Sequence, residues 1–198
     1  FRIEETYFKY FPVRYHCQLP IWTAFELREK VDIAAVESIT LFLARRYVTD
    51  RYADPDAWNP QTHGSADHSF PYLVAAAMVD GAVTSSTFTA DRYRNAEILA
   101  LAQKISLAED ADFTEAFPAT FNARLEAVLA NGETVVVHQQ NPKGVPANPM
   151  SDDDLEQKFL TQVGDVVSEA TARDILDRIW NLENAGSVTE LLAAMRVR

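Results

Sequence analysis

Residues 66–81 read Ala-Asp-His-Ser-Phe-Pro-Tyr-Leu-Val-Ala-Ala-Ala-Met-Val-Asp-Gly, and this stretch decides the fold. Asp67 or Ser69 can accept hydrogen bonds from the first free N–H groups of a helix. Pro71 is tolerated in a first helical turn, and Gly81 suits the left-handed residue that ends a helix. The middle of the stretch is uncharged and rich in alanine, so such a helix is stable only when most of its circumference is buried. The sequence therefore predicts a buried helix of about three turns with a polar Asp-His-Ser segment at its positive end.

The composition indicates a soluble globular protein with an acidic surface. The chain has 198 residues, of which 47% are hydrophobic, and its formal net charge is −11. This length allows one domain, or one domain plus an appendage, with a sizeable core. The negative charge disfavours nucleic acids and anionic membranes as partners, because phosphate binding needs clustered Lys and Arg. Cys17 is the single cysteine, which excludes an internal disulfide and fits a cytoplasmic location.

The patterns outside residues 66–81 predict an α+β fold. We expect a small, mainly antiparallel sheet of three or four strands packed with helices over residues 1–150, followed by an all-helical C-terminal tail over 151–198. In the first part, the expected elements are a helix over 19–31, a core strand over 36–48, a long ordered loop over 49–66, an amphipathic helix over 90–104, a strand over 105–107, a solvated acidic connection over 109–112 and a hairpin over 121–139. In the tail, we expect a first helix that Ser151 caps and two further helices over 169–181 and 188–195.

The hairpin is the clearest local signal after the buried helix. Asn131-Gly132 lies between two alternating stretches, which favours a two-residue type I′ turn with positive φ at both central residues. One face of the first strand should be buried. Its members alternate along the chain and are Phe121, Ala123, Leu125, Ala127 and Leu129.

Basic and polar side chains just before the helix over 19–31 form the first candidate site. Arg14 can hold a carboxylate through two parallel hydrogen bonds. His16 and Gln18 lie near a helix N-terminus, where an anion is favoured. The alternative is that Arg14 is a solvated cation and His16 a satisfied polar neighbour.

Three further positions carry candidate residues. Arg45, Arg46 and Tyr47 follow the expected core strand and either point toward a cleft or mark an edge strand that charge protects from pairing. Lys143 lies in a rigid loop with three prolines, as an ordinary loop lysine or as a device that attracts a polycarboxylate. His68 has a structural or a catalytic role at the start of the buried helix.

A metal site is disfavoured by the histidine spacing. His63 and His68 are five residues apart, whereas paired ligands on one helix face need i and i+4 spacing. No third or fourth ligand is signalled nearby. We therefore expect no metal.

Four segments of the chain carry motifs that occur in a known family. They are Phe-Pro-Val-Arg-Tyr-His-Cys-Gln at 11–18, Trp-Asn-Pro-Gln-Thr at 58–62, Ala-Asp-His-Ser-Phe-Pro-Tyr at 66–72, and Pro-Lys-Gly-Val-Pro-Ala-Asn-Pro-Met-Ser at 142–151. In this order they resemble the MmgE/PrpD family, which includes 2-methylcitrate dehydratase, cis-aconitate decarboxylase and iminodisuccinate epimerase. The resemblance covers most of the chain but does not choose among these substrates.

The resemblance implies that residues 1–150 are the lid domain of such an enzyme. The tail over 151–198 should then pack on an N-terminal helical domain that the chain lacks, and the chain, which opens without an initiator Met, should be a C-terminal piece. The family also implies no cofactor and proton abstraction next to a carboxylate. We expect a homodimer, because the tail alone exposes apolar surface to which a second copy can bind. A fragment without the helical domain should be inactive.

The resemblance turns the candidate residues into a site hypothesis. The catalytic residues are expected to be His16, Tyr47 and His68, and the substrate-binding residues Arg14, Gln18, Arg45, Arg46 and Lys143. The first functional hypothesis is a hydro-lyase of propionate metabolism that dehydrates 2-methylcitrate or a related tricarboxylate. The alternatives are an epimerase or decarboxylase of similar polycarboxylates, or a non-catalytic binding or dimerisation module.

Overall fold

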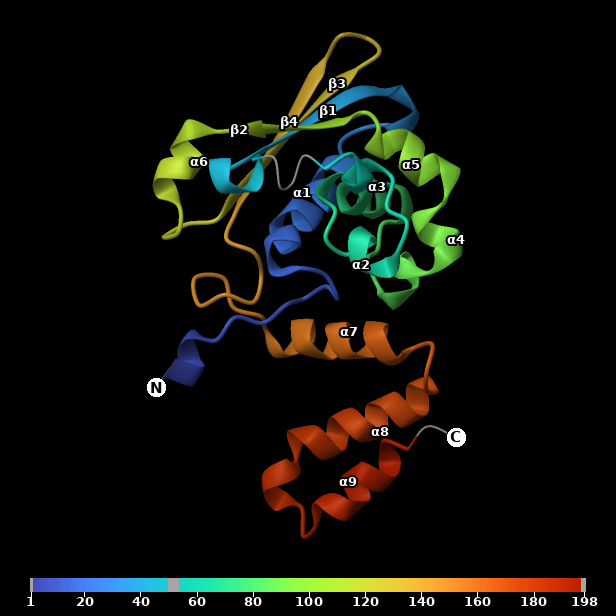
Figure 1. The fold of residues 1–198 in the computed structure, drawn as a ribbon. Coiled ribbons are helices and arrows are strands. Elements are labelled where there is room, and N and C mark those ends of the chain that lie inside the picture. The colour runs from blue at the N-terminus through green and yellow to red at the C-terminus, as the bar shows by residue number, and fades with distance from the viewer. Residues whose placement is uncertain (1, 50–53, 197–198) are drawn as a thin grey trace. The chain divides into compact units, whose positions relative to one another are not determined.

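The computed structural model describes residues 2–49 and 54–196 and divides the chain into two compact units, residues 1–149 and 150–198 (Figure 1). In the first unit the elements are α1 (Gln18–Arg28), β1 (Val36–Leu43), α2 (His63–Ala66), α3 (Phe70–Asp80), α4 (Ala90–Tyr93), α5 (Ala96–Ala102), β2 (Ile105–Glu109), α6 (Ala111–Ala116), β3 (Asn122–Leu129) and β4 (Thr134–Gln140). In the second unit they are α7 (Asp152–Val163), α8 (Glu169–Trp180) and α9 (Val188–Ala194).

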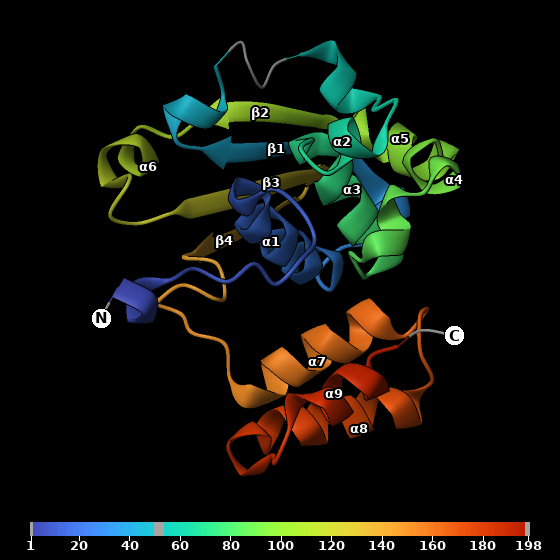
Figure 2. The same ribbon diagram turned by 60° about the horizontal axis from the view of Figure 1, so that its bottom comes forward.

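The first unit is built on a four-stranded sheet with the order β2-β1-β3-β4. β1 pairs with β3 and β3 with β4 in antiparallel fashion, whereas β1 and β2 are parallel, with Ile39 opposite Ile105. α1 packs on β3 and β4 and against α3, and both helices lie on the same face of the sheet (Figure 1, Figure 2). The α+β fold with a mainly antiparallel sheet is therefore confirmed.

The predicted core strand is present but shorter than expected. β1 ends at Leu43, and a short 3-10 turn over Arg45–Tyr47 follows it. Because β1 is an internal strand, the alternative that its basic end protects a sheet edge is wrong.

The buried helix forms as the sequence predicts. The Ser69 side chain accepts a hydrogen bond from the backbone N–H of Tyr72 at 3.0 Å, and Pro71 occupies the first turn. Gly81 ends the helix with a φ of 68°. All residues from Phe70 to Met78 are buried. A helix that is uncharged up to Val79 and has a polar start is thus held in the core of the first unit.

The hairpin is confirmed, with its expected face buried, but its turn type is wrong. Gly132 has a φ of 82°, whereas Asn141 is the non-glycine residue with positive φ in the described part of the chain. The Gly132 N–H donates to the carbonyl of Leu129 at 2.8 Å, so Ala130 and Asn131 form the centre of the turn. Gly132 then takes the left-handed position that follows such a turn.

Two further segments differ from the expectation. The helix predicted over 90–104 is split into α4 and α5, because the Asn95 side chain accepts hydrogen bonds from two backbone N–H groups and starts a new helix. The acidic connection is not merely solvated. Glu109 pairs with Arg45, and Asp110 caps α6 and pairs with Arg124 at 2.5 Å.

The loop predicted over 49–66 is partly ordered into short elements. Residues 50–53 of it lie outside the described residues. The remainder contains a 3-10 turn over Pro55–Trp58, which Asp54 caps, and the single turn α2. This segment leads directly into the Asp-His-Ser start of α3.

Up to residue 196, the second unit contains three α-helices, with α8 packed on both α7 and α9. Ser151 caps α7 and forms a reciprocal capping box with Asp154, so the predicted start of this helix is confirmed. Exposed apolar side chains include Trp180, Val188 and Leu192. In the described part of the chain, no helix combines the length and the apolarity that crossing a membrane requires.

Candidate functional site

Gln18, at the first residue of α1, ties the N-terminal segment to the core. Its side chain is fully buried. Oε1 accepts hydrogen bonds from the backbone N–H groups of Tyr10 and Phe11, and Nε2 donates to the carbonyl of Phe11, each at 2.9 Å. The expected contact of Gln18 with substrate is therefore not supported. It positions the segment that carries Arg14 and His16.

The two strongest sequence motifs meet in space. The backbone N–H of Arg14 donates to the carbonyl of Asp67 at 3.1 Å, and Sγ of the buried Cys17 lies 4.0 Å from the carbonyl oxygen of His68. The 3-10 turn over Tyr15–Cys17 is thereby fixed against the start of α3. Residues that are about fifty positions apart in the sequence thus form one continuous surface.

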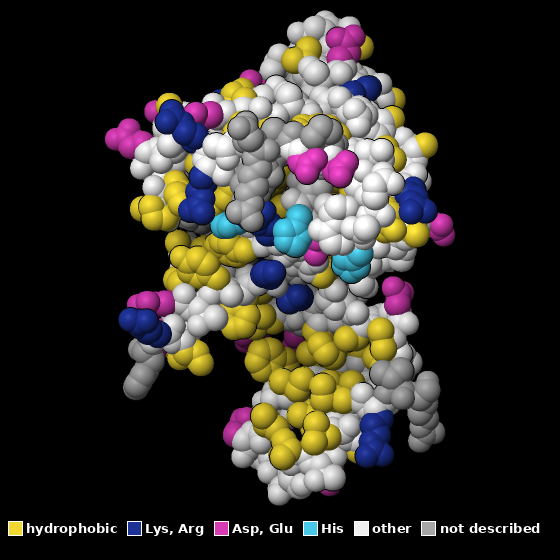
Figure 3. All heavy atoms as spheres, viewed as in Figure 1, with side chains coloured by type: hydrophobic (Ala, Val, Ile, Leu, Met, Phe, Trp, Pro, Cys, Tyr) yellow, Lys and Arg dark blue, Asp and Glu magenta, His cyan; other side chains and the backbone are white. Residues whose placement is uncertain are grey.

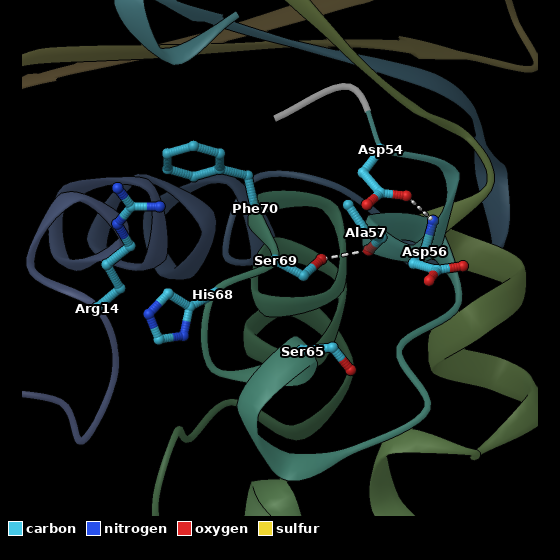
Figure 4. A pocket seen from close by; sticks show the side chains of 8 residues that line it. All are labelled: Arg14, Asp54, Asp56, Ala57, Ser65, His68, Ser69 and Phe70. Carbon is cyan, nitrogen blue, oxygen red and sulfur yellow. Dashed lines mark hydrogen bonds between the residues drawn. The ribbon is translucent and has the colours of Figure 1, made fainter. Parts of the chain in front are cut away.

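A polar pocket of about 170 Å³ opens at this junction (Figure 4). The Arg14 guanidinium, the His68 imidazole and the Phe70 ring lie on one side of it, and Asp54 and Asp56 lie on the other (Figure 4). The residues that line the pocket are Arg14, Asp54, Asp56, Ala57, Ser65, His68, Ser69 and Phe70. Figure 3 shows that histidine side chains gather beside Lys and Arg side chains on one face of the first unit.

His68 is oriented by its neighbour in sequence. Its Nδ1 lies 2.5 Å from Oδ1 of Asp67, and its side chain is 55% exposed. Ser69 is held in place because its hydroxyl caps α3 and also donates to the carbonyl of Ala57. The imidazole is therefore fixed at one nitrogen and accessible at the other.

His16 pairs with a buried tyrosine. Its Nδ1 lies 3.0 Å from the hydroxyl oxygen of Tyr47, and the two ring centroids are 4.6 Å apart. Tyr47 is fully buried and comes from the turn that follows β1. Burial, and then the positive charges of Arg14 and Arg46, lower the pKa of His16 to about 4. The imidazole is therefore neutral at pH 7.

Arg46 lies over two aromatic rings next to this pair. Its Cζ is 5.3 Å from the ring centroid of Tyr47 and 5.0 Å from that of Phe117. Such stacking holds a guanidinium by cation–π attraction while the charge stays available to an anion. Arg46 and Arg14 are thus the two cations whose charges act on His16.

Arg45 and Lys143 lie elsewhere. Nε of Arg45 donates to both carboxylate oxygens of Glu109, at 3.1 and 2.9 Å. Nζ of Lys143 lies 5.7 Å from a ring centroid of Trp22, in a separate pocket beside α1. The structure therefore brings together five of the eight expected site residues: Arg14, His16, Arg46, Tyr47 and His68.

Sequence reasoning missed three contributors to this surface. Asp67 is expected from the sequence as a helix cap and as part of the polar start of α3, although its position next to His68 also suggests an orienting carboxylate. Asp54 and Asp56 lie in the loop before α2 and gave no signal of their own. Their place in the pocket depends on how that loop folds back toward Ser69.

The histidines do not combine into a metal site in the described residues. His63 stacks on Phe88, with ring centroids 5.0 Å apart, and His138 stacks on Phe113 at 5.1 Å. Over residues 2–49 and 54–196, no group of three or more His, Cys, Asp or Glu side chains is placed to hold a metal ion.

Comparison with known proteins gives consistent matches. A model of the MmgE/PrpD C-terminal domain matches residues 11–184. Cis-aconitate decarboxylase of Mus musculus is 24% identical over 142 residues, which are 70% of this chain and 29% of that protein. The Homo sapiens enzyme of the same name is 24% identical over 69% of this chain and 28% of its own length, and the Aspergillus terreus enzyme is 24% identical over 63% and 26%. The chain thus spans less than a third of the curated relatives it matches.

Proposed function

The chain belongs to the MmgE/PrpD family, which includes lyases, and on that premise we propose that it supplies one wall of the active site of a cofactor-independent lyase. The proposed substrate is 2-methylcitrate or a related tricarboxylate, and the proposed reaction is dehydration. Because the chain spans less than a third of its relatives, the opposite wall is assigned to the expected N-terminal helical domain. Residues 1–198 alone should then be inactive.

The observation that carries the proposal is that two guanidinium groups lie near two imidazoles. Arg14 lines a pocket with His68, and Arg14 and Arg46 both act on His16. Loss of a proton from carbon next to a carboxylate places negative charge on the carboxylate oxygens. Fixed cations stabilise that charge most where water is excluded. Arg14 and Arg46 are the groups that fill this role.

The hydrogen bonds give the two imidazoles different roles. The Asp67 carboxylate can only accept, so the proton of neutral His68 lies on Nδ1 and the Nε2 lone pair is left as a base. A phenol is a stronger acid than a neutral imidazole N–H, so Tyr47 donates to Nδ1 of His16 and the proton of His16 lies on Nε2. His68 therefore takes the proton from carbon, and His16 donates to the leaving hydroxyl, which departs as water.

Decarboxylation is the second candidate, because the relatives described above are cis-aconitate decarboxylases. It needs the same stabilisation of charge by Arg14 and Arg46. It differs in the bond that breaks, since carbon dioxide leaves and a proton is delivered to carbon. Epimerisation of a similar acid would instead return the proton to the same carbon from the other face.

The test uses the intact protein that carries this domain. It is incubated with 2-methylcitrate, citrate and cis-aconitate while alkene absorbance and carbon dioxide release are followed. Dehydration produces an alkene without carbon dioxide, and decarboxylation releases carbon dioxide. Loss of the Arg14 charge in Arg14→Gln should lower kcat/KM by about 10–150-fold, the effect of removing a hydrogen bond to a charged group.

A matched variant distinguishes the effect of a charge at the pocket from the effect of the net charge of the chain. Arg94 is exposed at the end of α4, and Arg94→Gln removes the same charge away from the pocket. It should leave kcat/KM unchanged. A binding or dimerisation module without catalysis predicts no turnover of any of these acids by the unaltered protein, and that result would refute the lyase.

A further inference from the structure

His16 also lines a second cavity, of about 300 Å³, whose walls are aromatic and aliphatic. The N-terminal segment contributes Tyr15, and the loop between α6 and β3 contributes Phe117 and Phe121. Val145 closes it from the loop after β4. We call this cavity the aromatic chamber. Figure 3 shows hydrophobic side chains next to the histidine and basic side chains on this face of the first unit.

The aromatic chamber is uncharged in a strongly charged chain. None of the described residues that line it is Asp, Glu, Lys or Arg. Burial lowers the pKa of His16 to about 4 and raises that of Tyr15 to about 12, so both side chains are neutral at pH 7. Oδ1 of Asn141 accepts a hydrogen bond from the backbone N–H of Phe121 at 3.2 Å. The residues that line the chamber therefore offer a carboxylate neutral hydrogen-bond donors but no cation.

The chamber adjoins the polar pocket through the turn that carries both histidine and arginine. Arg14 lines the polar pocket and His16 lines the chamber, with Tyr15 alone between them in sequence. The ring of Phe121 lies 6.0 Å from that of His16 and 5.5 Å from that of Tyr47, measured between centroids. Phe121 and Val145 are themselves buried, so the apolar wall is built into the fold.

We propose that the aromatic chamber is a subsite for a hydrocarbon substituent of the substrate, so that the substrate is a polycarboxylate with an alkyl arm longer than methyl. This rests on the proposed lyase function. A carboxylate is held at Arg14, the carbon that carries the leaving hydroxyl lies at His16, and the arm enters the chamber. Hydrocarbon is favoured there because its removal from water is driven by the hydrophobic effect, and no charged group has to be desolvated.

The expected gain is measurable. Burial of one methylene corresponds to a ratio of about fourfold at 25 °C. We therefore expect kcat/KM of the intact protein to rise about fourfold at each step from citrate to 2-methylcitrate and on to the ethyl and propyl homologues. The volume of the chamber exceeds the need of a methyl group, so the rise should not stop at 2-methylcitrate.

Two filling variants and a control complete the test. Ala119 and Ala147 line the chamber and are exposed at its mouth, so Ala119→Phe or Ala147→Phe adds a ring there without disturbing a buried position. Each should abolish the preference for ethyl and propyl over methyl while citrate turnover stays within about twofold. Ala130→Phe, at the exposed tip of the β3–β4 hairpin, should leave the whole series unchanged.

The outcomes separate this subsite from the function on which it rests. A lyase that turns over citrate and 2-methylcitrate but rejects the longer homologues overturns the chamber proposal alone. So does a preference that Ala119→Phe and Ala147→Phe both leave intact. A protein that turns over none of the series refutes the lyase, and the chamber proposal falls with it.

Discussion

Acid should destabilise the first unit through His16. Burial, followed by the charges of Arg14 and Arg46, lowers the pKa of this imidazole from 6.5 to about 4 in the folded chain. The unfolded chain therefore binds a proton near pH 6.5 that the folded chain rejects until about pH 4. The contribution of neutral His16 to the free energy of unfolding is fully present above pH 6.5 and is lost as the pH falls toward 4. Replacement of His16 by Gln removes this loss.

The magnitude follows from the width of that window. The pKa difference of about 2.5, at about 1.4 kcal/mol per unit, sets an upper limit of about 3.5 kcal/mol on the free energy of unfolding that His16 removes in acid. His16 is only partly buried, so solvent screens part of this effect. We expect about 1–2 kcal/mol to remain.

The assay compares the acid loss of stability in two proteins. Urea unfolding is followed at about pH 7 and about pH 4.5 by tryptophan fluorescence, in a Trp180→Phe background so that Trp22 and Trp58 report on the first unit. Paired carboxylates such as Glu109 also lose stability in acid, and they do so equally with and without His16→Gln. The variant should therefore lose about 1–2 kcal/mol less than the unaltered chain between the two pH values.

His63 provides the matched control. It is exposed and stacked on Phe88, and His63→Gln should keep the full acid loss of stability. If His16→Gln and the unaltered chain lose the same free energy of unfolding between the two pH values, His16 is not held neutral by its surroundings. The assignment of His16 as a neutral donor beside Tyr47 would then fail.

Two further substitutions test the local structure that positions the site. Gln18→Leu removes three hydrogen bonds to the segment of Phe11, and the buried backbone groups left unpaired should lower the free energy of unfolding by about 2–4 kcal/mol in urea titrations; an unchanged unfolding midpoint would show that the segment is not held by this amide. Gly81→Ala should cost about 1 kcal/mol, because φ is 68° and the added Cβ meets the guanidinium of Arg28 at 3.1 Å, whereas Gly64→Ala, with nothing within 4 Å, should cost less than half as much. Equal losses at the two glycines would contradict the strain.

The parts of the fold that local chemistry determines could be predicted. α3 carries its own start in Ser69 and its own end in Gly81, so neither end depends on distant residues. The buried face of β3 follows from alternation alone. The turn of the hairpin was predicted wrongly, because Asn-Gly fits a type I′ turn and also fits a turn in which only Gly132 is left-handed.

The parts that distant contacts determine could not be predicted. Arg45 was a plausible cation for substrate until the sheet brought Glu109, 64 positions later, within hydrogen-bonding distance. Gln18 looked like a polar group near a helix N-terminus, yet its amide completes the backbone hydrogen bonds of a preceding loop. A buried polar side chain must find partners, and only the folded chain shows whether those partners are backbone or ligand.

The same electrostatics that keep His16 neutral bear on the proposed chemistry. Burial is the larger cause of the lowered pKa, and the charges of Arg14 and Arg46 add to it. The same two positive charges favour loss of the Nε2 proton of His16, because they stabilise the imidazole that has given up a proton. In the proposed reaction that proton goes to the leaving hydroxyl, which departs as water. We therefore expect Arg14 to act in two ways, by holding a carboxylate and by assisting proton donation from His16, two residues later.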